Sequence, residues 1–248
     1  MIEVCSIEYG LATVESEMNK EIRFSESRLE DLVSLSMTTL DRRLNPAIVI
    51  AVSCMTGKIN RGIITLAKVA QYLFLSHKIH ALVTDDDLSE SARQYPVLTG
   101  DIMLGHTLKK VCDPEIFPYA DQFVKLIKTI NEGVLLRWRY KSKVIPLKDH
   151  ELILSKEKAS LTALVARLSA KLSGMPSYHI EKIEKFGYDL GMAWAASEAA
   201  ACQSLYQEHL NRAEAILNSL RDHVPVKPLQ EIMDFFKAEI ADNITIKE

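Results

Sequence analysis

The chain has 248 residues, which is enough to bury a sizeable hydrophobic core within one domain. Hydrophobic residues make up 48% of it and charged residues 25%, a globular balance that argues against intrinsic disorder. The formal net charge of −3 provides no basic field for phosphates, so we expect no nucleic-acid partner. The longest apolar run, residues 47–55, is too short to span a bilayer, and no basic signal-peptide segment opens the chain. These features predict a cytoplasmic protein without a transmembrane segment.

The hydrophobic pattern predicts an all-α fold in a single domain over residues 1–248. Apolar residues recur at helical spacing, and only 9 glycines and 8 prolines interrupt the chain. Asp113, followed by Pro114 and Glu115, is typical of a helix start, and Gly174 is placed to end a helix. In chain order we expect helices over approximately 29–44, 47–55, 63–84, 96–112, 113–140, 149–174, 177–221 and 229–240.

The four cysteines lie far apart and form no CxxC pair. Zinc sites and disulfide frameworks use regular spacings, so we expect reduced and mostly buried thiols instead. The residues concerned are Cys5, Cys54, Cys112 and Cys202.

Gly187 and Gly191 lie four residues apart inside the predicted helix 177–221. Glycine in a helix interior costs on the order of 1 kcal/mol relative to alanine. Two glycines in successive turns therefore indicate that a neighbouring helix or a ligand comes close to this backbone, with a helix-packing face as the simpler interpretation.

Three stretches, taken together, resemble the trans-prenyl diphosphate synthase family. Residues 42–46 (RRLNP) are similar to the family's Lys-Arg-Leu-Arg-Pro, and residues 71–80 (QYLFLSHKIH) are similar to the helix before its first aspartate motif. Residues 159–174 and 186–194 are similar to the family's Lys-Thr-Ala-Ser-Leu and Tyr-Gly-x-x-Leu-Gly-x-Ala-Phe-Gln helices. The resemblance implies an isoprenoid-synthase-type helical bundle around a central hydrophobic cavity.

The family's basic stretch grips the diphosphate of the homoallylic substrate. The resemblance implies this role, in vestigial form, for Arg42 and Arg43, because Asn45 replaces the last cation. A solvated helix end explains the two arginines equally well. Residues 99–101 also fit the family's Gly-Asp after the first motif, although only Arg93 remains of the arginines before it.

The family binds magnesium through two aspartate-rich motifs, and both are degenerate here. The first motif, DDxxD, is expected at residues 81–85, where only Asp85 remains of its aspartates. The second is expected from residue 198 onward, where a single Glu198 remains. The other ligand positions carry Ala81 and Leu82 in the first motif, and Ala199 and Cys202 in the second.

Divalent metal ions that stabilise a departing diphosphate need clustered oxygen ligands. The sequence therefore predicts no catalytic residue, no metal site and no cofactor in this chain alone. The resemblance also places Glu157 and Lys158 at the family's Lys-Thr pair, which reverses the charge at its diphosphate-binding lysine.

Two weaker metal sites compete with this interpretation. Asp86, Asp87 and Glu90 could rebuild a site one turn further along, although an exposed acidic helix end is favoured. His77 and His80 are three residues apart, but satisfied core histidines are favoured over metal ligands.

Two-component bacterial long-chain synthases of this family pair a catalytic subunit with a shorter companion that lacks the motifs. The chain resembles that companion, the non-catalytic small subunit of a heptaprenyl- or hexaprenyl-type diphosphate synthase, an enzyme that commonly makes menaquinone side chains. The resemblance implies a hetero-oligomer with a catalytic large subunit, magnesium on that partner, an isoprenoid chain in a hydrophobic tunnel, and an interface around residues 97–139. An atypical magnesium-dependent prenyltransferase and a free-standing isoprenoid-binding protein are the alternatives.

Overall fold

The computed structural model describes residues 6–22, 37–83, 90–141, 143–199 and 202–245, and no strand occurs within these ranges. The all-α prediction is confirmed for this part of the chain. In order, the elements are α1 (Ile7–Glu21), α3 (Thr39–Cys54), α4 (Arg61–His80), α5 (Glu90–Val111), the 3-10 turn η1 (Phe117–Tyr119), α6 (Ala120–Arg139), α7 (Leu147–Leu154), the π-helical turn η2 (Ser155–Ala159), α8 (Ser160–Leu172), α9 (Ser177–Ser197), α10 (Gln203–Leu220) and α11 (Lys227–Thr245).

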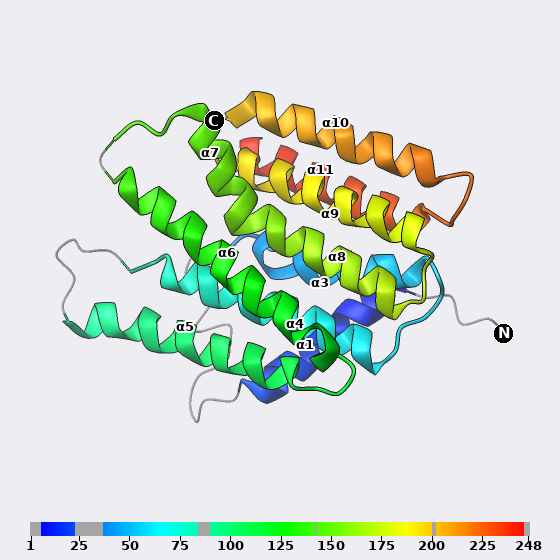
Figure 1. Ribbon diagram of the computed structural model, residues 1–248, viewed down its shortest axis with the longest axis horizontal. Coiled ribbons are helices and arrows are strands. Elements are labelled where there is room, and N and C mark those ends of the chain that lie inside the picture. The colour runs from blue at the N-terminus through cyan, green and yellow to red at the C-terminus, as the bar shows by residue number, and fades with distance from the viewer. Residues whose placement is uncertain (1–5, 23–36, 84–89, 142, 200–201, 246–248) are drawn as a thin grey trace.

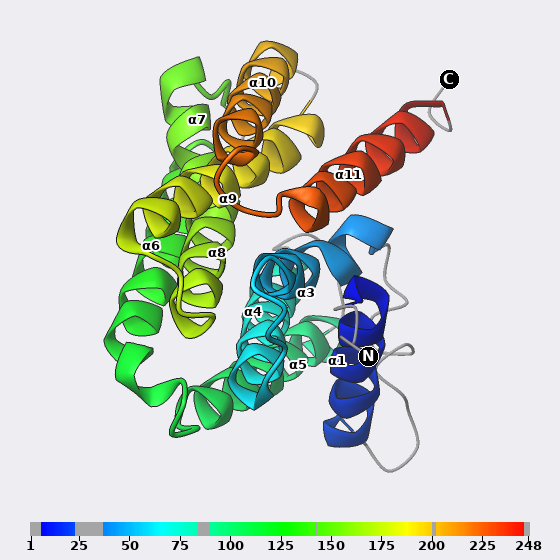
Figure 2. The same ribbon diagram turned by 90° about the vertical axis from the view of Figure 1, so that its right-hand side faces the viewer.

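The centre of the bundle is formed by α3, α4, α8 and α9 (Figure 1). Figure 2 shows α6 to α10 grouped on one side and α1, α3, α4 and α5 on the other, while α11 packs on α3. Helix α4 is buried on nearly every side, and Ile63, Leu66 and Val69 have no exposed surface. A helix that is apolar all round belongs in a core, so α4 is the helix about which the others are arranged.

Helix α3 begins earlier than the sequence predicts, and Pro46 lies inside it instead of before it. Its start is set by a capping box. The Thr38 hydroxyl accepts from the backbone N–H of Asp41, and the Asp41 carboxylate accepts from the backbone N–H of Thr38. This box satisfies donors of the first turn and starts the helix upstream of the proline.

The helix predicted over residues 113–140, unlike α3, begins later than the sequence predicts. Asp113 caps only a turn, in which its carboxylate accepts from the backbone N–H of Glu115, and α6 begins at Ala120. The turn carries Ile116 into the core, where it has no exposed surface. Burial of this side chain explains why the helix does not begin at the local start signal.

The predicted helix 177–221 is two helices. Helix α9 ends at Ser197, α10 begins at Gln203, and α10 packs back on α9 (Figure 1). Residues 195–201 are rich in alanine, so local propensity alone predicts continuation. Packing overrides that preference, because Cys202 and Leu205 are buried in a cluster with Met192.

The cysteine prediction is wrong for Cys54, which is disulfide-bonded. Cys112 is a free thiol as expected, although it is exposed. Cys202 is free and buried as expected, while Cys5 lies outside the described residues. Within the described ranges, no helix is both long enough and apolar enough to cross a membrane.

Helices α8 and α9 approach so closely that side chains are excluded from part of their contact. A Cβ on Gly187 would lie 2.6 Å from the Thr162 carbonyl oxygen. A Cβ on Gly191 would overlap the Thr162 hydroxyl and lie 2.8 Å from the Cα of Ala159. The two glycines therefore form the helix-packing face that their spacing indicates.

We predict that Gly191→Ala destabilises the protein by about 1–3 kcal/mol, because the added methyl group overpacks a contact with backbone atoms. Urea unfolding measures the difference in free energy. The control is Gly105→Ala in α5, where nothing lies within 4 Å of an added Cβ. There the change should be stabilising, by up to about 1 kcal/mol, since alanine is the better helix former. Equal effects of both substitutions would contradict the close contact.

Helix α1 is fastened to the bundle by a cluster of ionic hydrogen bonds around Glu21. Its carboxylate accepts from Lys68 at 3.0 Å, Lys110 at 2.6 Å and the Tyr72 hydroxyl at 2.9 Å. Lys68 is only 3% exposed and also donates to Glu17 at 2.5 Å. Burial by itself raises the pKa of Glu21, but the hydrogen bonds from Lys110 and Lys68 outweigh it and hold that pKa below its ordinary value.

The lowered pKa of Glu21 predicts a loss of stability in acid. The stabilisation is present above the ordinary glutamate pKa of 4.5 and is lost as the pH falls through the lower folded-state value. We expect Glu21→Gln to cost about 1–3 kcal/mol near pH 7, and this cost should shrink below pH 4.5. Thermal melting of both proteins across pH measures it. The control Glu8→Gln removes an ion pair whose glutamate is 77% exposed, and it should cost less than about 1 kcal/mol.

Candidate functional site

The first motif position lies at the C-terminal end of α4. Ala81 is the C-cap residue and is exposed, and Leu82 follows in a half-exposed turn. Neither side chain offers an oxygen, nitrogen or sulfur atom to a metal. Residues 85–87, which include Asp85, lie outside the described ranges, and so does the side chain of Glu90 at the start of α5. The acidic alternative at Asp86, Asp87 and Glu90 therefore stays a prediction.

His80, just before this position, holds α5 against α4. Its Nε2 lies 3.1 Å from the Asp101 carboxylate and 3.3 Å from the Val97 carbonyl oxygen. The Gly100 carbonyl accepts from the Ser76 hydroxyl at 2.9 Å, and a Cβ on Gly100 would overlap the His80 ring. The Gly-Asp pair that resembles the family therefore has a packing role in this chain.

The second motif position lies at the C-terminal end of α9. Glu198 is the C-cap residue, and its side chain is 41% exposed. Ala199 lies in the turn that follows, and Cys202 is fully buried with its sulfur 3.4 Å from Nδ1 of His150. The three positions therefore do not share a helix face, because the helix ends at the first of them.

Lys158, in the π-helical turn before α8, is the residue that faces Glu198. Its ammonium donates to the Glu198 carboxylate at 2.5 Å and lies 3.9 Å from the centroid of the Trp194 ring and 6.0 Å from that of Phe74. The side chain is 12% exposed. Burial lowers the pKa of Lys158, while the neighbouring Glu198 acts in the opposite direction. A single ammonium thus contacts α4 and α9 from the turn between α7 and α8.

A second ion pair lies nearby. Lys78, on the last turn of α4, donates at 3.3 Å to the carboxylate of Asp41, which has no exposed surface. Both residues are close enough to influence the charge on Lys158 electrostatically. We call Lys78, Asp41, Lys158 and Glu198 the ion cluster; its two cations and two anions balance.

The π-helical turn sends three consecutive charged side chains to three different partners. Lys156 donates to Glu132 at 2.6 Å, and Glu157 accepts three hydrogen bonds of 2.8–3.2 Å from the Arg137 guanidinium, both partners being on α6. Only Lys158 turns toward α9. The charge that faces the second motif position is therefore positive, although the sequence resemblance places Glu157 at the family's lysine position.

The two arginines of the first stretch differ in their surroundings. Arg43 forms an ion pair with Glu8 of α1 at 2.7 Å. Arg42 is exposed and has no hydrogen-bond or ion-pair partner among the described residues. Of the two, Arg42 is the one available to an anion.

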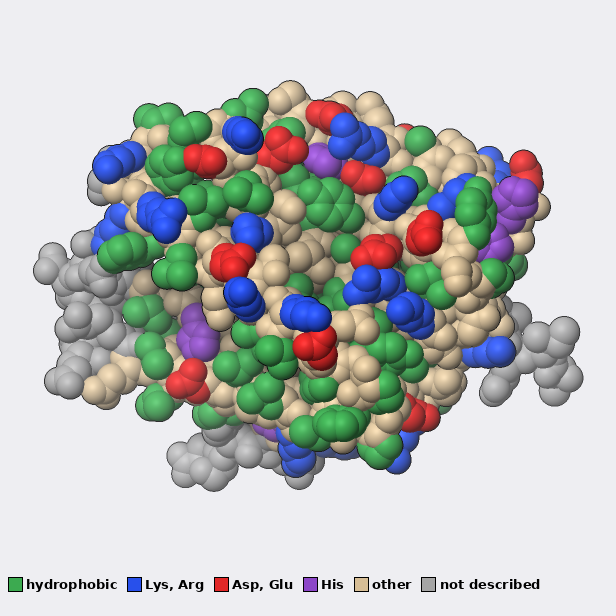
Figure 3. All heavy atoms as spheres, viewed as in Figure 1, with side chains coloured by type: hydrophobic (Ala, Val, Ile, Leu, Met, Phe, Trp, Pro, Cys, Tyr) green, Lys and Arg blue, Asp and Glu red, His purple; other side chains and the backbone are tan. Residues whose placement is uncertain are grey.

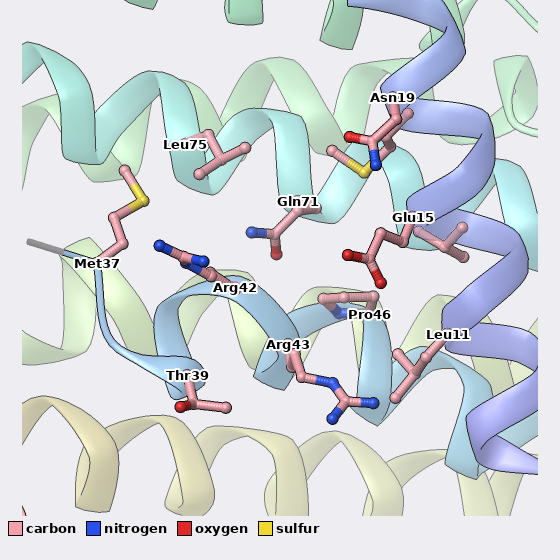
Figure 4. Close-up of a pocket in the computed structure, with 12 residues that line it drawn as sticks. Leu11, Glu15, Asn19, Met37, Thr39, Arg42, Arg43, Pro46, Gln71 and Leu75 are labelled. Atoms are coloured by element: carbon pink, nitrogen blue, oxygen red, sulfur yellow. The ribbon is translucent and has the colours of Figure 1, made fainter. Parts of the chain in front are cut away.

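Arg42 points into a cavity of about 610 Å³ between α1, α3 and α4 (Figure 4). Gln71 also points into it, only 3% exposed, and its Oε1 has no partner while its Nε2 donates to the Asp41 carbonyl at 2.9 Å. The lining residues are Leu11, Val14, Glu15, Met18, Asn19, Met37, Thr39, Arg42, Arg43, Pro46, Gln71 and Leu75. Apolar walls with a few polar groups are the usual make-up of a small-molecule pocket.

A smaller cavity of about 260 Å³ lies between α4, α5 and α6. Leu73, Leu104 and Ile127 contribute apolar walls, and His77 contributes the polar ring of the predicted histidine pair. Burial lowers the pKa of His77, so its imidazole is neutral at neutral pH. His77 therefore lines the cavity. Among the described residues, no group of three metal-binding side chains exists.

The described residues do not fit the magnesium site that the sequence resemblance implies. The first motif position has no ligand atoms at Ala81 and Leu82, and the remaining carboxylate of the second position, Glu198, is already neutralised by Lys158. Magnesium needs several oxygen ligands in a near-octahedral arrangement.

No sequence pattern pairs Glu198 with Lys158, and none singles out Lys78 or Asp41. The signal that could indicate the first contact is the opposite charge of the two side chains, since Glu198 lies in the second degenerate motif and Lys158 at the Lys-Thr position of the resemblance. The contact itself depends on a π-helical turn, for which the sequence has no recognisable pattern.

Comparison of whole structures identifies the fold. A polyprenyl synthase from Caulobacter crescentus CB15, complexed with calcium and isoprenyl diphosphate, superposes with a TM-score of 0.77 over 97% of this chain and 98% of that chain, at 15% identity. The geranyl diphosphate synthase small subunit from Antirrhinum majus superposes with a TM-score of 0.67 over 93% of this chain and 98% of that chain, at 19% identity. A deletion mutant of the heterotetrameric geranyl pyrophosphate synthase of mint gives 0.69 over 93% and 98%, at 14% identity.

The sequence itself matches no protein-family model and no curated protein. At such low identities the structural likeness establishes the fold alone. The chain has the all-α isoprenoid synthase fold, and its structural neighbours are trans-prenyltransferases.

Proposed function

We propose that this chain is a non-catalytic small subunit of a two-component all-trans polyprenyl diphosphate synthase, in which it supports chain elongation by a catalytic partner. The observation that carries the proposal is the ion pair between Lys158 and Glu198, which stands where an active relative of this fold would need free carboxylates. Ionisation of an allylic diphosphate requires metal ions to stabilise the leaving group. With that requirement unmet by the described residues of both motif positions, the chemistry belongs to another subunit in this proposal, and magnesium is expected there.

An apolar surface on α5 and α6 supports the partner role. Of the fifteen exposed large hydrophobic residues among the described residues, nine lie between residues 95 and 138. We call them the α5–α6 face: Tyr95, Val97, Leu98, Leu108, Phe117, Val124, Val134, Leu135 and Trp138. Figure 3 shows hydrophobic side chains, with charged ones among them, on the face of the molecule on which α5 and α6 lie. Large exposed apolar patches are typical of protein–protein interfaces, and residues 97–139 are where the sequence predicts one.

The small cavity between α4, α5 and α6 borders this face, because Val134 lines the cavity and is 38% exposed. An interface over α5 and α6 would therefore lie beside an apolar space within this subunit. This arrangement supports a role in completing or lengthening the hydrophobic tunnel that receives the growing isoprenoid chain. Menaquinone side-chain synthesis in the cytoplasm is the setting we propose. The small-subunit and heterotetrameric neighbours support such an assembly by analogy of fold.

The proposal predicts that the chain is active only together with a partner. When it is co-expressed with a candidate subunit that carries two intact DDxxD motifs, the two proteins should co-purify. Incorporation of isopentenyl diphosphate, or the length of the product, should differ from that of the partner alone. Identical incorporation and product length with and without this chain would refute the proposal.

Other outcomes of the same experiment identify the alternatives. Turnover of farnesyl diphosphate with magnesium by the purified chain, lost on Asp86→Ala, would identify an atypical active prenyltransferase. A monomer or homodimer that binds prenyl lipid but no synthase would identify a free-standing isoprenoid-binding protein.

We predict that charged residues on the α5–α6 face weaken the complex. Leu135 and Trp138 are 62% and 66% exposed, and they lie three residues apart on α6. The double variant Leu135→Glu/Trp138→Glu should raise the dissociation constant roughly 30-fold or more, as expected for central apolar anchors of an interface. Isothermal titration calorimetry with the partner measures it. Tyr178→Glu on α9, where the tyrosine is 58% exposed, is the matched control and should leave the affinity unchanged. Equal affinities of both variants would place the interface elsewhere.

A further inference from the structure

The ammonium of Lys158 is held in one place by contacts from three elements. The π-helical turn supplies the lysine, α9 supplies the Glu198 carboxylate and the Trp194 ring, and α4 supplies Phe74. The side chain is 12% exposed, so this is not a surface lysine free to turn into water. A fixed cation over an aromatic face and against a carboxylate is favourable, because both partners attract positive charge.

The ammonium also completes the charge balance of its surroundings. Asp41 is already paired with Lys78, and Glu198 is paired with Lys158. Each carboxylate of the ion cluster thus has its own internal cation. A divalent ion bound beside this ion cluster would meet two fixed ammonium groups, and like charges at close range repel strongly where water is partly excluded.

We propose that Lys158 is a permanent internal counter-ion that stands in place of a divalent cation between the ends of α4 and α9, and that it excludes metal even when carboxylates are restored. The loss of metal binding in this chain therefore has two causes. Ligands are missing at Ala81 and Leu82, and the Lys158 ammonium lies against Glu198 at the end of α9, close enough to Lys78 in the last turn of α4 to interact with it electrostatically. This inference concerns the isolated chain and holds whether or not a partner subunit exists.

The test adds carboxylates and then removes the lysine. Ala81→Asp/Leu82→Asp places two acids just beyond Lys78 at the end of α4, where the native residues are exposed and half-exposed. In that background, Lys158→Thr removes the ammonium, and Lys158→Met removes the charge while keeping an aliphatic stem on Trp194. Binding of Mn²⁺ by the purified chain is measured from the electron paramagnetic resonance signal of the free ion. We expect roughly tenfold or tighter binding once the ammonium is gone, because a like charge at close range is removed.

The matched control is Lys156→Thr in the same background. It removes one positive charge from the same π-helical turn, but its ammonium points to Glu132 on α6. This variant should bind Mn²⁺ no better than the background protein. Circular dichroism checks that each variant folds, and the methionine variant serves if the threonine variant does not. Equal Mn²⁺ affinity with and without Lys158, whether measurable in both proteins or in neither, would overturn the proposal.

Discussion

The backbones of α8 and α9 can touch only because Gly187 and Gly191 present no side chain to Thr162. This contact fixes the π-helical turn, which leads directly into α8, beside the last turns of α9. Lys158 from the turn and Glu198 from the end of α9 meet as a result. The pairing of charges in the ion cluster therefore depends on a packing contact that only glycine, the smallest residue, allows.

The ion cluster shows that negative charge in one fold can be compensated in two ways, by bound metal ions or by cations of the protein itself. Clustered carboxylates repel one another and need metal ions to compensate, whereas paired ammonium and carboxylate groups compensate each other within the protein. The ion cluster is of the second kind, with Lys158 facing Glu198 and Lys78 facing Asp41. Its ion pairs are partly buried, so the charged groups lose hydration and are held in a fixed geometry. Such pairs need no bound metal ion to compensate their charge.

The remaining features divide between the two sides of α4. On one side, α1 and α3 enclose a cavity that contains the Arg42 guanidinium and the Gln71 amide, whose Oε1 has no partner among the described residues. On the other, α5 and α6 enclose a smaller apolar cavity and present an exposed apolar surface outward. The ionic hydrogen bonds of Glu21 to Lys68 and Lys110 connect these sides, because they join α1 to α4 and α5. A partner on the α5–α6 face would thus lie beside the smaller cavity and not beside the cavity that Arg42 enters.

By itself, the sequence determined the all-α class, the packing role of Gly187 and Gly191, the helix stop at Gly174 with its φ of 74°, and the amphipathic last helix. These features are local, because periodicity and glycine placement record which face of a helix is buried. Only the tertiary structure decided that the helix ends at Ser197, that Lys158 and not Glu157 faces α9, and that Glu8 neutralises Arg43 while Arg42 has no partner among the described residues. Each of these outcomes depends on a partner at least 20 residues away along the chain or on burial of a neighbouring side chain, and no local pattern encodes such a pairing.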